Sequence, residues 1–505
     1  MIFSSPLFLI FFTIVVLFSW YILPALFSGE RHLFYHHLFL LIASYIFYLS
    51  WDWRFGFLIS FSTVVDFVAG LLIKQNDTPE KNRIRKWILL LSVTTNLGIL
   101  AYFKYTNFFI SSFVDAVNGV MPGTYTSAEQ ESLLLDIILP LGISFFTFQS
   151  MSYTVDVYRR VIPAEKSLVK FALYVSFFPQ LVAGPIVVAK DFLPQLQNLP
   201  VFDLDRMRIA ARWFALGYFK KTVLADNMAP LVDAVHAAPQ SFDAIGHWLG
   251  AFGFWVQVYG DFSGYTDMAW GTALFLGYNL PENFRMPYLS RLPSEHWQRW
   301  HISLIRWIRD YLYIPLGGNR VSFWRHKLNV FLTMFLAGVW HGANWTFVLW
   351  GAVHGSLLVL ETIINEKLKL IPFFRDPGSS FQKIISIPFV SYLNNFLFFL
   401  GTSFCTVYFG VLFRSDDISK AGIIMKRMIG LDPVIMPLPS ISLYRPVILG
   451  CLCVIIGHII GYRIFEKKRE WNVPGWAEVA LAPLLILLFI QLGTGDASPF
   501  IYFVF

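Results

Sequence analysis

Residues 6–27 read PLFLIFFTIVVLFSWYILPALF and contain no charged side chain. About 20 apolar residues in a helix are enough to cross the hydrocarbon core of a bilayer. This run has no basic start and no small-residue cleavage site before Glu30, so we expect a retained membrane helix and not a signal peptide. The whole chain has the same character, because only 14% of its 505 residues are charged and 56% are hydrophobic. Soluble domains carry about 25% charged residues, so we predict a polytopic integral membrane protein.

Similar apolar runs recur along the chain, at residues 38–48, 57–73, 87–103, 137–153, 171–189, 248–262, 330–339, 347–364, 389–413, 446–464 and 479–492. They predict roughly 11–13 membrane segments. Several runs are too short to cross alone, which is typical of tilted or re-entrant helices buried by their neighbours. No polar stretch is long enough to form a soluble domain. We therefore predict an all-α fold, a polytopic helical bundle, with one membrane domain over residues 1–505.

Lysine and arginine are distributed unevenly between the connections of this bundle. They crowd residues 74–86 and 159–170, whereas residues 104–132 nearly lack them. Because cytoplasmic loops carry an excess of positive charge, we expect both basic connections in the cytoplasm and the amino terminus and residues 104–132 outside. Topology explains the basic residues better than nucleic-acid binding does, so no nucleic-acid partner is predicted.

The stretch at about residues 259–355 interrupts the hydrophobic pattern and contains most of the chemistry. It begins with YGDFSGYTDMAWG, in which Asp261 and Asp267 stand beside apolar segments. A carboxylate at membrane depth costs about 3 kcal/mol or more, so it should be paired or line a wet cavity. The alternative is a helix cap at the interface. On the first interpretation, Asp261 is a candidate substrate-binding residue.

The segment SEHWQRWHISLIRWIRDYLYIPLGGNR, residues 294–320, is the densest in polar side chains. Its charged residues recur at helical spacing opposite an apolar face rich in tryptophan, which predicts an amphipathic helix lying in the plane of the membrane. The charged stripe consists of Glu295, Arg299, Arg306 and Arg309. His301 lies on the apolar face; a buried histidine is more often structural than catalytic, but the charge around it keeps it a candidate.

His341 follows a mostly apolar run and is flanked by Gly338 and Gly342, which would leave space beside its imidazole. Histidine is the side chain best suited to take a proton near neutral pH, and apolar surroundings favour the neutral form that a base requires. A metal pair of His341 with His354 lacks a third ligand in suitable spacing, and the three cysteines lie inside apolar runs. No metal and no tightly bound cofactor are predicted.

At these motifs the chain resembles the membrane-bound O-acyltransferase (MBOAT) family, and within it the alginate O-acetyltransferase branch. The motifs are RWHISLIRWIRDYLYIPLGGNR and VWHGANWTFVLWG, supported by MIFSSPLFLIFF, LPLGISFFTFQSMSYTVDVYR, AGPIV, GYFKKTVLADN and VYFGVLFRSDD, so the resemblance spans nearly the whole chain. It implies in-plane helices around a catalytic tunnel. It also matches His341 to the family's catalytic histidine and His301 to the second histidine of the signature. One departure is SRLPSEHW, where Pro293 suits a helix start.

The resemblance further implies acetyl transfer across a bacterial cytoplasmic membrane to a periplasmic acetyltransferase partner, which would decorate an exported polysaccharide as part of exopolysaccharide machinery. The expected donor is acetyl-CoA or another acyl thioester. We expect His341 to be the base. Asn344 and Trp345, or His301, would help bind the carbonyl. Candidates for contacts with the anionic donor or with anionic lipid are Arg306, Arg309 and Arg320. Asp310 is a further candidate for substrate binding.

Other functions fit parts of this pattern. Peptidoglycan or cellulose O-acetylation would use similar machinery, and D-alanyl transfer to teichoic acid is more distant. A transporter or flippase could use intramembrane histidines and aspartates, but the chain shows no convincing repeats. A non-catalytic scaffold of a secretion complex would not need His341.

Overall fold

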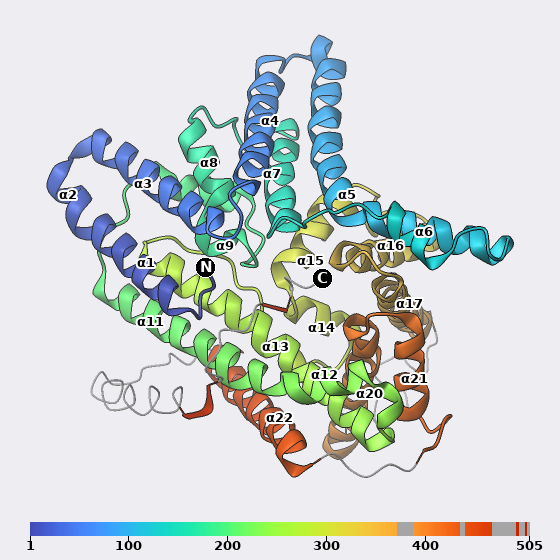
Figure 1. Cartoon of the computed structure of the whole chain (residues 1–505). Helices are drawn as coiled ribbons and strands as arrows, with labels where there is room; N and C mark the ends of the chain where they lie inside the picture. Colours follow the sequence, from blue (N-terminus) through green and yellow to red (C-terminus); the bar gives the residue numbers. More distant parts are fainter. Residues whose placement is uncertain (371–386, 435–439, 467–490, 494–499, 502–505) are drawn as a thin grey trace. The chain divides into compact units, whose positions relative to one another are not determined.

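The computed structural model describes residues 1–370, 387–434, 440–466, 491–493 and 500–501, and every regular element among these residues is a helix (Figure 1). The α-helices are α1 (Pro6–Leu17), α2 (Leu23–Leu26), α3 (Gly29–Leu49), α4 (Phe55–Gln75), α5 (Asn82–Val120), α6 (Ser127–Leu133), α7 (Ile143–Tyr158), α8 (Leu168–Ser176), α9 (Phe178–Leu181), α10 (Ala189–Phe192), α11 (Leu204–Phe219), α12 (Ala229–Ala237), α13 (Ala244–Phe275), α14 (Pro293–Arg299), α15 (Ile302–Ile308), α16 (Phe323–His341), α17 (Trp345–Leu370), α20 (Pro388–Arg414), α21 (Ile418–Met428) and α22 (Ile441–Gly461). The predicted all-α fold is confirmed.

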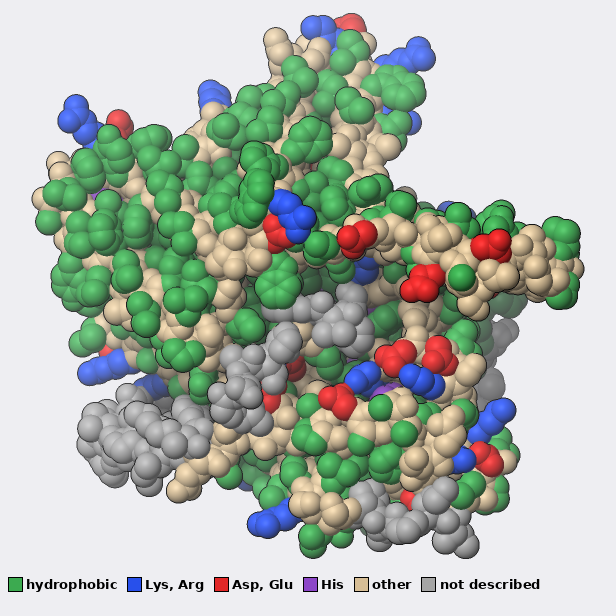
Figure 2. Space-filling view, viewed as in Figure 1, with side chains coloured by type: hydrophobic (Ala, Val, Ile, Leu, Met, Phe, Trp, Pro, Cys, Tyr) green, Lys and Arg blue, Asp and Glu red, His purple; other side chains and the backbone are tan. Residues whose placement is uncertain are grey.

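Seven of the described helical segments are long and apolar enough to cross a membrane: Pro6–Leu26, Gly29–Leu49, Phe55–Gln75, Pro79–Val120, Trp345–Glu366, Pro388–Arg414 and Ile441–Ile464. In each of them most residues are not buried inside the chain. Figure 2 shows apolar side chains spread over the surfaces of α1, α3 and α4. Apolar surface on this scale requires a hydrocarbon solvent, and the chain is a multi-pass membrane protein.

Several of the other apolar runs form shorter or more buried helices. The run at 137–153 lies mostly in α7, which is buried along almost its whole length, and the run at 171–189 is broken into α8 and α9 at Phe177. Most of the run at 479–492 lies outside the described residues.

The chain divides into two compact units. Among the described residues, unit 1 comprises Met1–Gly217 and Tyr265–Pro281, and unit 2 comprises Tyr218–Gly264 and those that lie within Glu282–Ile501. Helix α13 contributes residues to both.

A buried polar cluster joins three helices of unit 1. The carboxylate of Asp66 on α4 accepts hydrogen bonds from Ser92 and Asn96 on α5 and from Thr154 on α7. Figure 1 shows these helices side by side. Because a buried carboxylate is costly unless its oxygens are satisfied, this cluster fixes how the three helices face one another.

The two basic connections meet at one end of unit 1. Asp77, after α4, pairs with Arg85 at 3.2 Å and with Arg160, which follows α7, at 2.9 Å. Arg85 also donates to the carbonyl of Tyr158 at 2.7 Å. Residues 74–86 and 159–170 therefore lie on the same side of this unit.

Residues 104–132 were predicted to be a connection between helices, and this prediction was wrong. Helix α5 continues to Val120, and α6 follows from Ser127. Phe108, Phe109, Phe113 and Val114 recur at helical spacing, which extends the helix beyond the apolar run that defined it.

In unit 2, α16 and α17 form an antiparallel helical hairpin, and α14 and α20 also pack on α17. Pro293 begins α14, as predicted.

Candidate active site

His341 is the last residue of α16, and its side chain is only 4% exposed. The rings of Trp350 on α17 and Phe413 on α20 lie 5.3 Å and 5.0 Å from its ring centroid, both at steep angles. Aromatic rings in this arrangement hold the imidazole in one orientation and exclude water around it. The sequence prediction that His341 occupies an apolar setting is confirmed.

Gly338, which stands one helical turn before His341, has a different role from the one predicted. A Cβ atom on Gly338 would lie 2.6 Å from the Cα atom of Gly351 and 2.6 Å from the carbonyl oxygen of Phe347. The space is therefore filled by the backbone of α17 and is not left open beside the imidazole. Gly338 and Gly351 allow α16 and α17 to pack closely, as small residues do between membrane helices.

His301 is 1% exposed and stands between two short helices, α14 and α15. Its backbone is left-handed, with φ 46°. Its Nδ1 lies 3.1 Å from Oδ1 of Asn283, and the ring of Phe262 meets its ring edge-on at 4.7 Å. Burial lowers the pKa of His301 to about 3, so the imidazole is neutral near pH 7.

The helix is broken at His301. This corrects the prediction of one continuous amphipathic helix through residues 295–309. Helix α14 ends at Arg299, α15 begins at Ile302, and a π-helical turn, η8 (Arg309–Tyr313), follows. The chain turns here because the backbone N–H of Ile302 donates to the carbonyl of Asn283 at 2.9 Å instead of continuing the helix. Helical spacing in the sequence does not reveal this capture by a residue far upstream.

Trp340 connects the two histidines within unit 2. Its ring lies 6.1 Å from that of His301 and 5.0 Å from that of the adjacent His341. The two signature histidines stand 40 positions apart in the chain. Both nevertheless lie close to the ring of Trp340.

Comparisons with known proteins identify the family of this chain. The family model of the membrane-bound O-acyltransferases matches residues 100–410, which include both histidines. The chain belongs to the MBOAT family. A probable alginate O-acetylase of Pseudomonas syringae pv. tomato is 35% identical over 100% of both chains. Its counterpart in Pseudomonas aeruginosa is 43% identical over 72% of this chain and 66% of its own length. A peptidoglycan O-acetyltransferase of Helicobacter pylori is 30% identical over 100% of this chain and 98% of its own.

Asp261 of this MBOAT chain lies inside α13 and does not cap a helix. It is 2% exposed, and its Oδ1 lies 2.6 Å from the ammonium of Lys221, which also reaches Asp226 at 2.8 Å. The backbone N–H of Ile501 donates to its other oxygen at 2.6 Å. Burial raises the pKa of Asp226 to about 6. Of the two interpretations of Asp261, pairing is therefore correct.

The remaining candidate residues lie at or near the ends of helices. Asn344 caps α17: its Oδ1 accepts from the N–H of Thr346 at 3.0 Å and its Nδ2 donates to the carbonyl of Asp416 at 2.6 Å. Trp345 is 50% exposed at the start of α17. Arg309 pairs with Asp310 at 2.8 Å in η8, Arg306 is half-buried on α15, and Arg320 is exposed.

His354 lies on α17 one turn beyond Trp350, whose ring is 4.8 Å from its own. His341 and His354 thus both touch Trp350. Among the residues that the structure describes, no group of three or more His, Cys, Asp or Glu side chains is placed to hold a metal ion.

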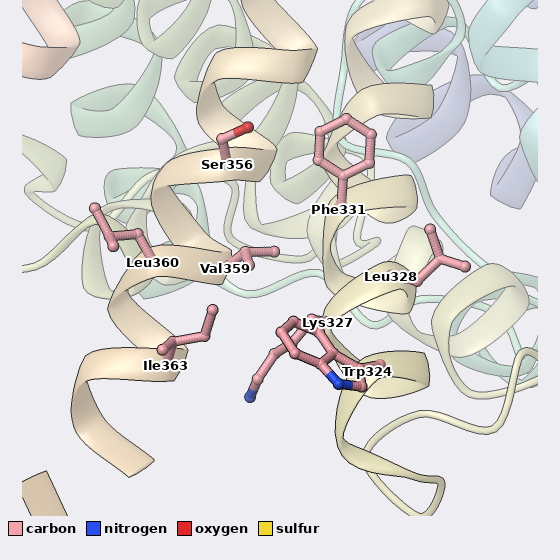
Figure 3. A pocket seen from close by; sticks show the side chains of 8 residues that line it. All are labelled: Trp324, Lys327, Leu328, Phe331, Ser356, Val359, Leu360 and Ile363. Atoms are coloured by element: carbon pink, nitrogen blue, oxygen red, sulfur yellow. The ribbon is translucent and has the colours of Figure 1, made fainter. Parts of the chain in front are cut away.

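A pocket of about 420 Å³ lies between α16 and α17 (Figure 3). Its walls are mostly apolar and consist of Trp324, Lys327, Leu328, Phe331, Ser356, Val359, Leu360 and Ile363. The ammonium of Lys327 pairs with Glu366 at 2.6 Å. Because Phe331 precedes His341 by about 15 Å of helix, this pocket is separate from the candidate active site.

Sequence reasoning missed Asn283, Lys221 and Trp340. Lys221 and Trp340 occur in motifs that carry the family resemblance, GYFKKTVLADN and VWHGANWTFVLWG, but spacing gave them no role. Asn283 stands in a connection whose pattern predicts no element.

Proposed function

We propose that this protein transfers acetyl groups for the O-acetylation of an exported, alginate-like polysaccharide. The observation that supports the proposal most is the pairing of two buried histidines, His341 and His301, around Trp340 in a chain related over its full length to a probable alginate O-acetylase. The expected donor is acetyl-CoA or another acyl thioester, and a periplasmic acetyltransferase would receive the acetyl group and modify the polymer.

His341 is the proposed general base. The acceptor hydroxyl gives its proton to the imidazole while its oxygen forms the new C–O bond with the thioester carbonyl carbon. The C–S bond then breaks, and the leaving thiolate takes the proton back from the imidazolium. General base catalysis of this kind contributes about 10²–10⁴ in rate, and the rings of Trp350 and Phe413 keep water from competing with the hydroxyl.

We place the protein in a bacterial cytoplasmic membrane with its amino terminus outside. The basic connections at residues 74–86 and 159–170 would then face the cytoplasm. Their shared ion pairs at Asp77 support the same side for both connections. The rule of positive charge assigns that side to the cytoplasm.

The test compares His341→Ala with wild type in cells that make the polymer, at equal levels of each protein in the membrane. His247, which is 0% exposed on α13, provides a matched control, because His247→Ala also removes a buried imidazole. We expect His341→Ala to lose acetyl ester with normal polymer export, and His247→Ala to keep it. Wild-type ester content in His341→Ala would refute the assignment, and loss of export with acetylated residual polymer would indicate transport instead.

Peptidoglycan is the second candidate acceptor, favoured by the full-length similarity to the Helicobacter pylori enzyme. Ester measurements on purified sacculi from the same strains separate the two. Ester that depends on His341 in sacculi, with none in the exported polymer, would move the proposal to peptidoglycan.

A further inference from the structure

Asn283 lies in the connection between α13 and α14 and holds the start of α15. Its backbone carbonyl accepts from the N–H of Ile302 at 2.9 Å. Its side-chain Oδ1 accepts from the N–H of Ser303 at 3.2 Å and from the hydroxyl of Ser303 at 2.9 Å. The same oxygen lies 3.1 Å from Nδ1 of His301. Asn283, Ser303 and His301 are all buried, at 3%, 4% and 1% exposure.

These contacts define which nitrogen of His301 carries a proton. The oxygen and nitrogen of an asparagine amide are hard to tell apart by shape, so their identity follows from their partners. A backbone N–H can only donate, so the atom that faces Ser303 N must be the amide oxygen. The nitrogen of His301 that faces this oxygen must then donate to it. In a neutral imidazole, a protonated Nδ1 leaves the lone pair on Nε2.

This tautomer decides how a neutral His301 meets a substrate. With a lone pair in place of a proton, Nε2 accepts a hydrogen bond and has none to donate. It can therefore orient a hydroxyl group, but it cannot stabilise the oxygen of a thioester carbonyl, which needs a donor. The sequence-based hypothesis that His301 helps bind the carbonyl does not fit this protonation state.

We propose that Asn283 is a positioning residue that holds His301 in the Nδ1-protonated tautomer, so that Nε2 accepts a hydrogen bond from a second hydroxyl of the acceptor, next to the one that reacts. This inference rests on the proposed acyl transfer. His301 holds the acceptor through this second hydroxyl while His341 removes the proton of the reacting hydroxyl. Carboxylates and carbonyls fix the tautomers of catalytic and metal-binding histidines in the same manner, and losing such a partner costs about 10–10⁴-fold in activity.

The first experiment reads the tautomer directly and does not depend on activity. Solid-state NMR of protein labelled with ¹⁵N-histidine, in lipid, gives the protonation of both ring nitrogens of His301, assigned by subtracting the spectrum of His301→Gln. We expect a protonated Nδ1 and an unprotonated Nε2 in wild type, the same in Asn283→Asp, and a mixture in Asn283→Ala. A protonated Nε2 in wild type overturns the proposal even if His341→Ala abolishes acetylation.

The second experiment asks whether the tautomer matters for transfer. Asn283→Ala should lose about 10–10²-fold of the ester-forming rate. Asn283→Asp keeps an oxygen facing Nδ1 and should retain most of the rate, but its carboxylate favours the imidazolium, so the acid limb of the pH–rate profile should move to higher pH. Ser303→Ala removes one donor to the same oxygen but leaves Nδ1 paired, so it should lose much less of the rate than Asn283→Ala.

The melting temperature of Asn283→Ala, and its elution as a single species in detergent, show whether this variant folds. If it does not fold, the test relies on Asn283→Asp. Equal loss of rate in Asn283→Asp and Asn283→Ala would overturn the proposal. It would show that the amide N–H group of Asn283, which is buried and has no hydrogen-bond acceptor among the described residues, is what transfer requires.

Discussion

Replacing Gly338 by alanine should separate α16 from α17 and displace His341. The three atoms nearest to an added Cβ are all backbone atoms of α17, at 2.6–2.8 Å. Carbon atoms in contact lie about 3.5–4.0 Å apart, so the helices must move by about 1 Å. No side-chain rotation can relieve this contact, because backbone atoms make it.

The cost has two components. Overpacking of a well-packed helix contact destabilises a protein by about 1–3 kcal/mol. His341 stands three residues after Gly338, about one helical turn away, so the same movement shifts the imidazole relative to the rings of Trp350 and Phe413. A displacement of about 1 Å at a catalytic group costs about 10²-fold in rate. We therefore expect a large loss of activity in a protein that is only moderately destabilised.

The assay measures ester formed per amount of membrane protein, together with the melting temperature of the purified protein in detergent. Gly401 on α20 is the matched control, because no neighbouring atom lies within 4 Å of its added Cβ. Gly401→Ala should keep full activity and be as stable as wild type, or more stable by up to about 1 kcal/mol from its better helix propensity.

Gly351→Ala tests, from the other helix, whether close packing of α16 and α17 positions His341. Its added Cβ would lie 2.9 Å from the Cα of Gly338 and 2.9 Å from the carbonyl oxygens of Met334 and Phe335. If close packing of the two helices positions His341, both glycine variants should lose activity. A Gly338→Ala protein with wild-type melting and wild-type rate would refute the reasoning, and a silent Gly351→Ala would limit the effect to the turn before His341.

Two further perturbations test buried titratable groups of unit 2. Lys221→Met leaves the carboxylates of Asp226 and Asp261 without their shared ammonium and should cost about 3–5 kcal/mol; adding Asp261→Asn should recover part of this loss in detergent unfolding, and an additive double variant would contradict the pairing. Burial lowers the pKa of His236 to about 3, so its contribution to stability is complete above its unfolded pKa of about 6.5 and falls by up to about 1.4 kcal/mol per pH unit below it. His236→Asn should unfold with a correspondingly smaller dependence on pH between 7 and 5, whereas an unchanged slope would show that His236 is charged in the folded protein.

Local sequence patterns predicted the parts of this fold that depend on local chemistry. Apolar runs predicted α1, α3 and α4, since nearly all residues of such a run favour the same environment. Pro293 predicted the start of α14, and the apolar neighbours of His341 predicted its burial. In each case the deciding residues stand within a few positions of the feature.

The remaining features depend on residues far apart in the chain. Gly338 is explained by Gly351 on the next helix, and Asp261 by Lys221, which stands 40 residues earlier. In both cases the two residues are too far apart in the sequence for helical or strand periodicity to relate them. Sequence periodicity could therefore place these residues on an element, but could not say what they face.

The break at His301 shows why the site itself escapes such patterns. Met286 and His301 both adopt left-handed backbone conformations, at φ 41° and 46°, each of which costs about 1–2 kcal/mol for a residue with a side chain. Local propensity alone would remove this strain by continuing the helix through residues 295–309. The strained conformation persists because Asn283 binds the backbone of Ile302 and both polar groups of Ser303, and those bonds exist only when the helix is broken. Backbone strain held in place by buried hydrogen bonds is typical of functional sites. Here it positions the imidazole of His301 beside Trp340, where a continuous helix would have given it a different direction.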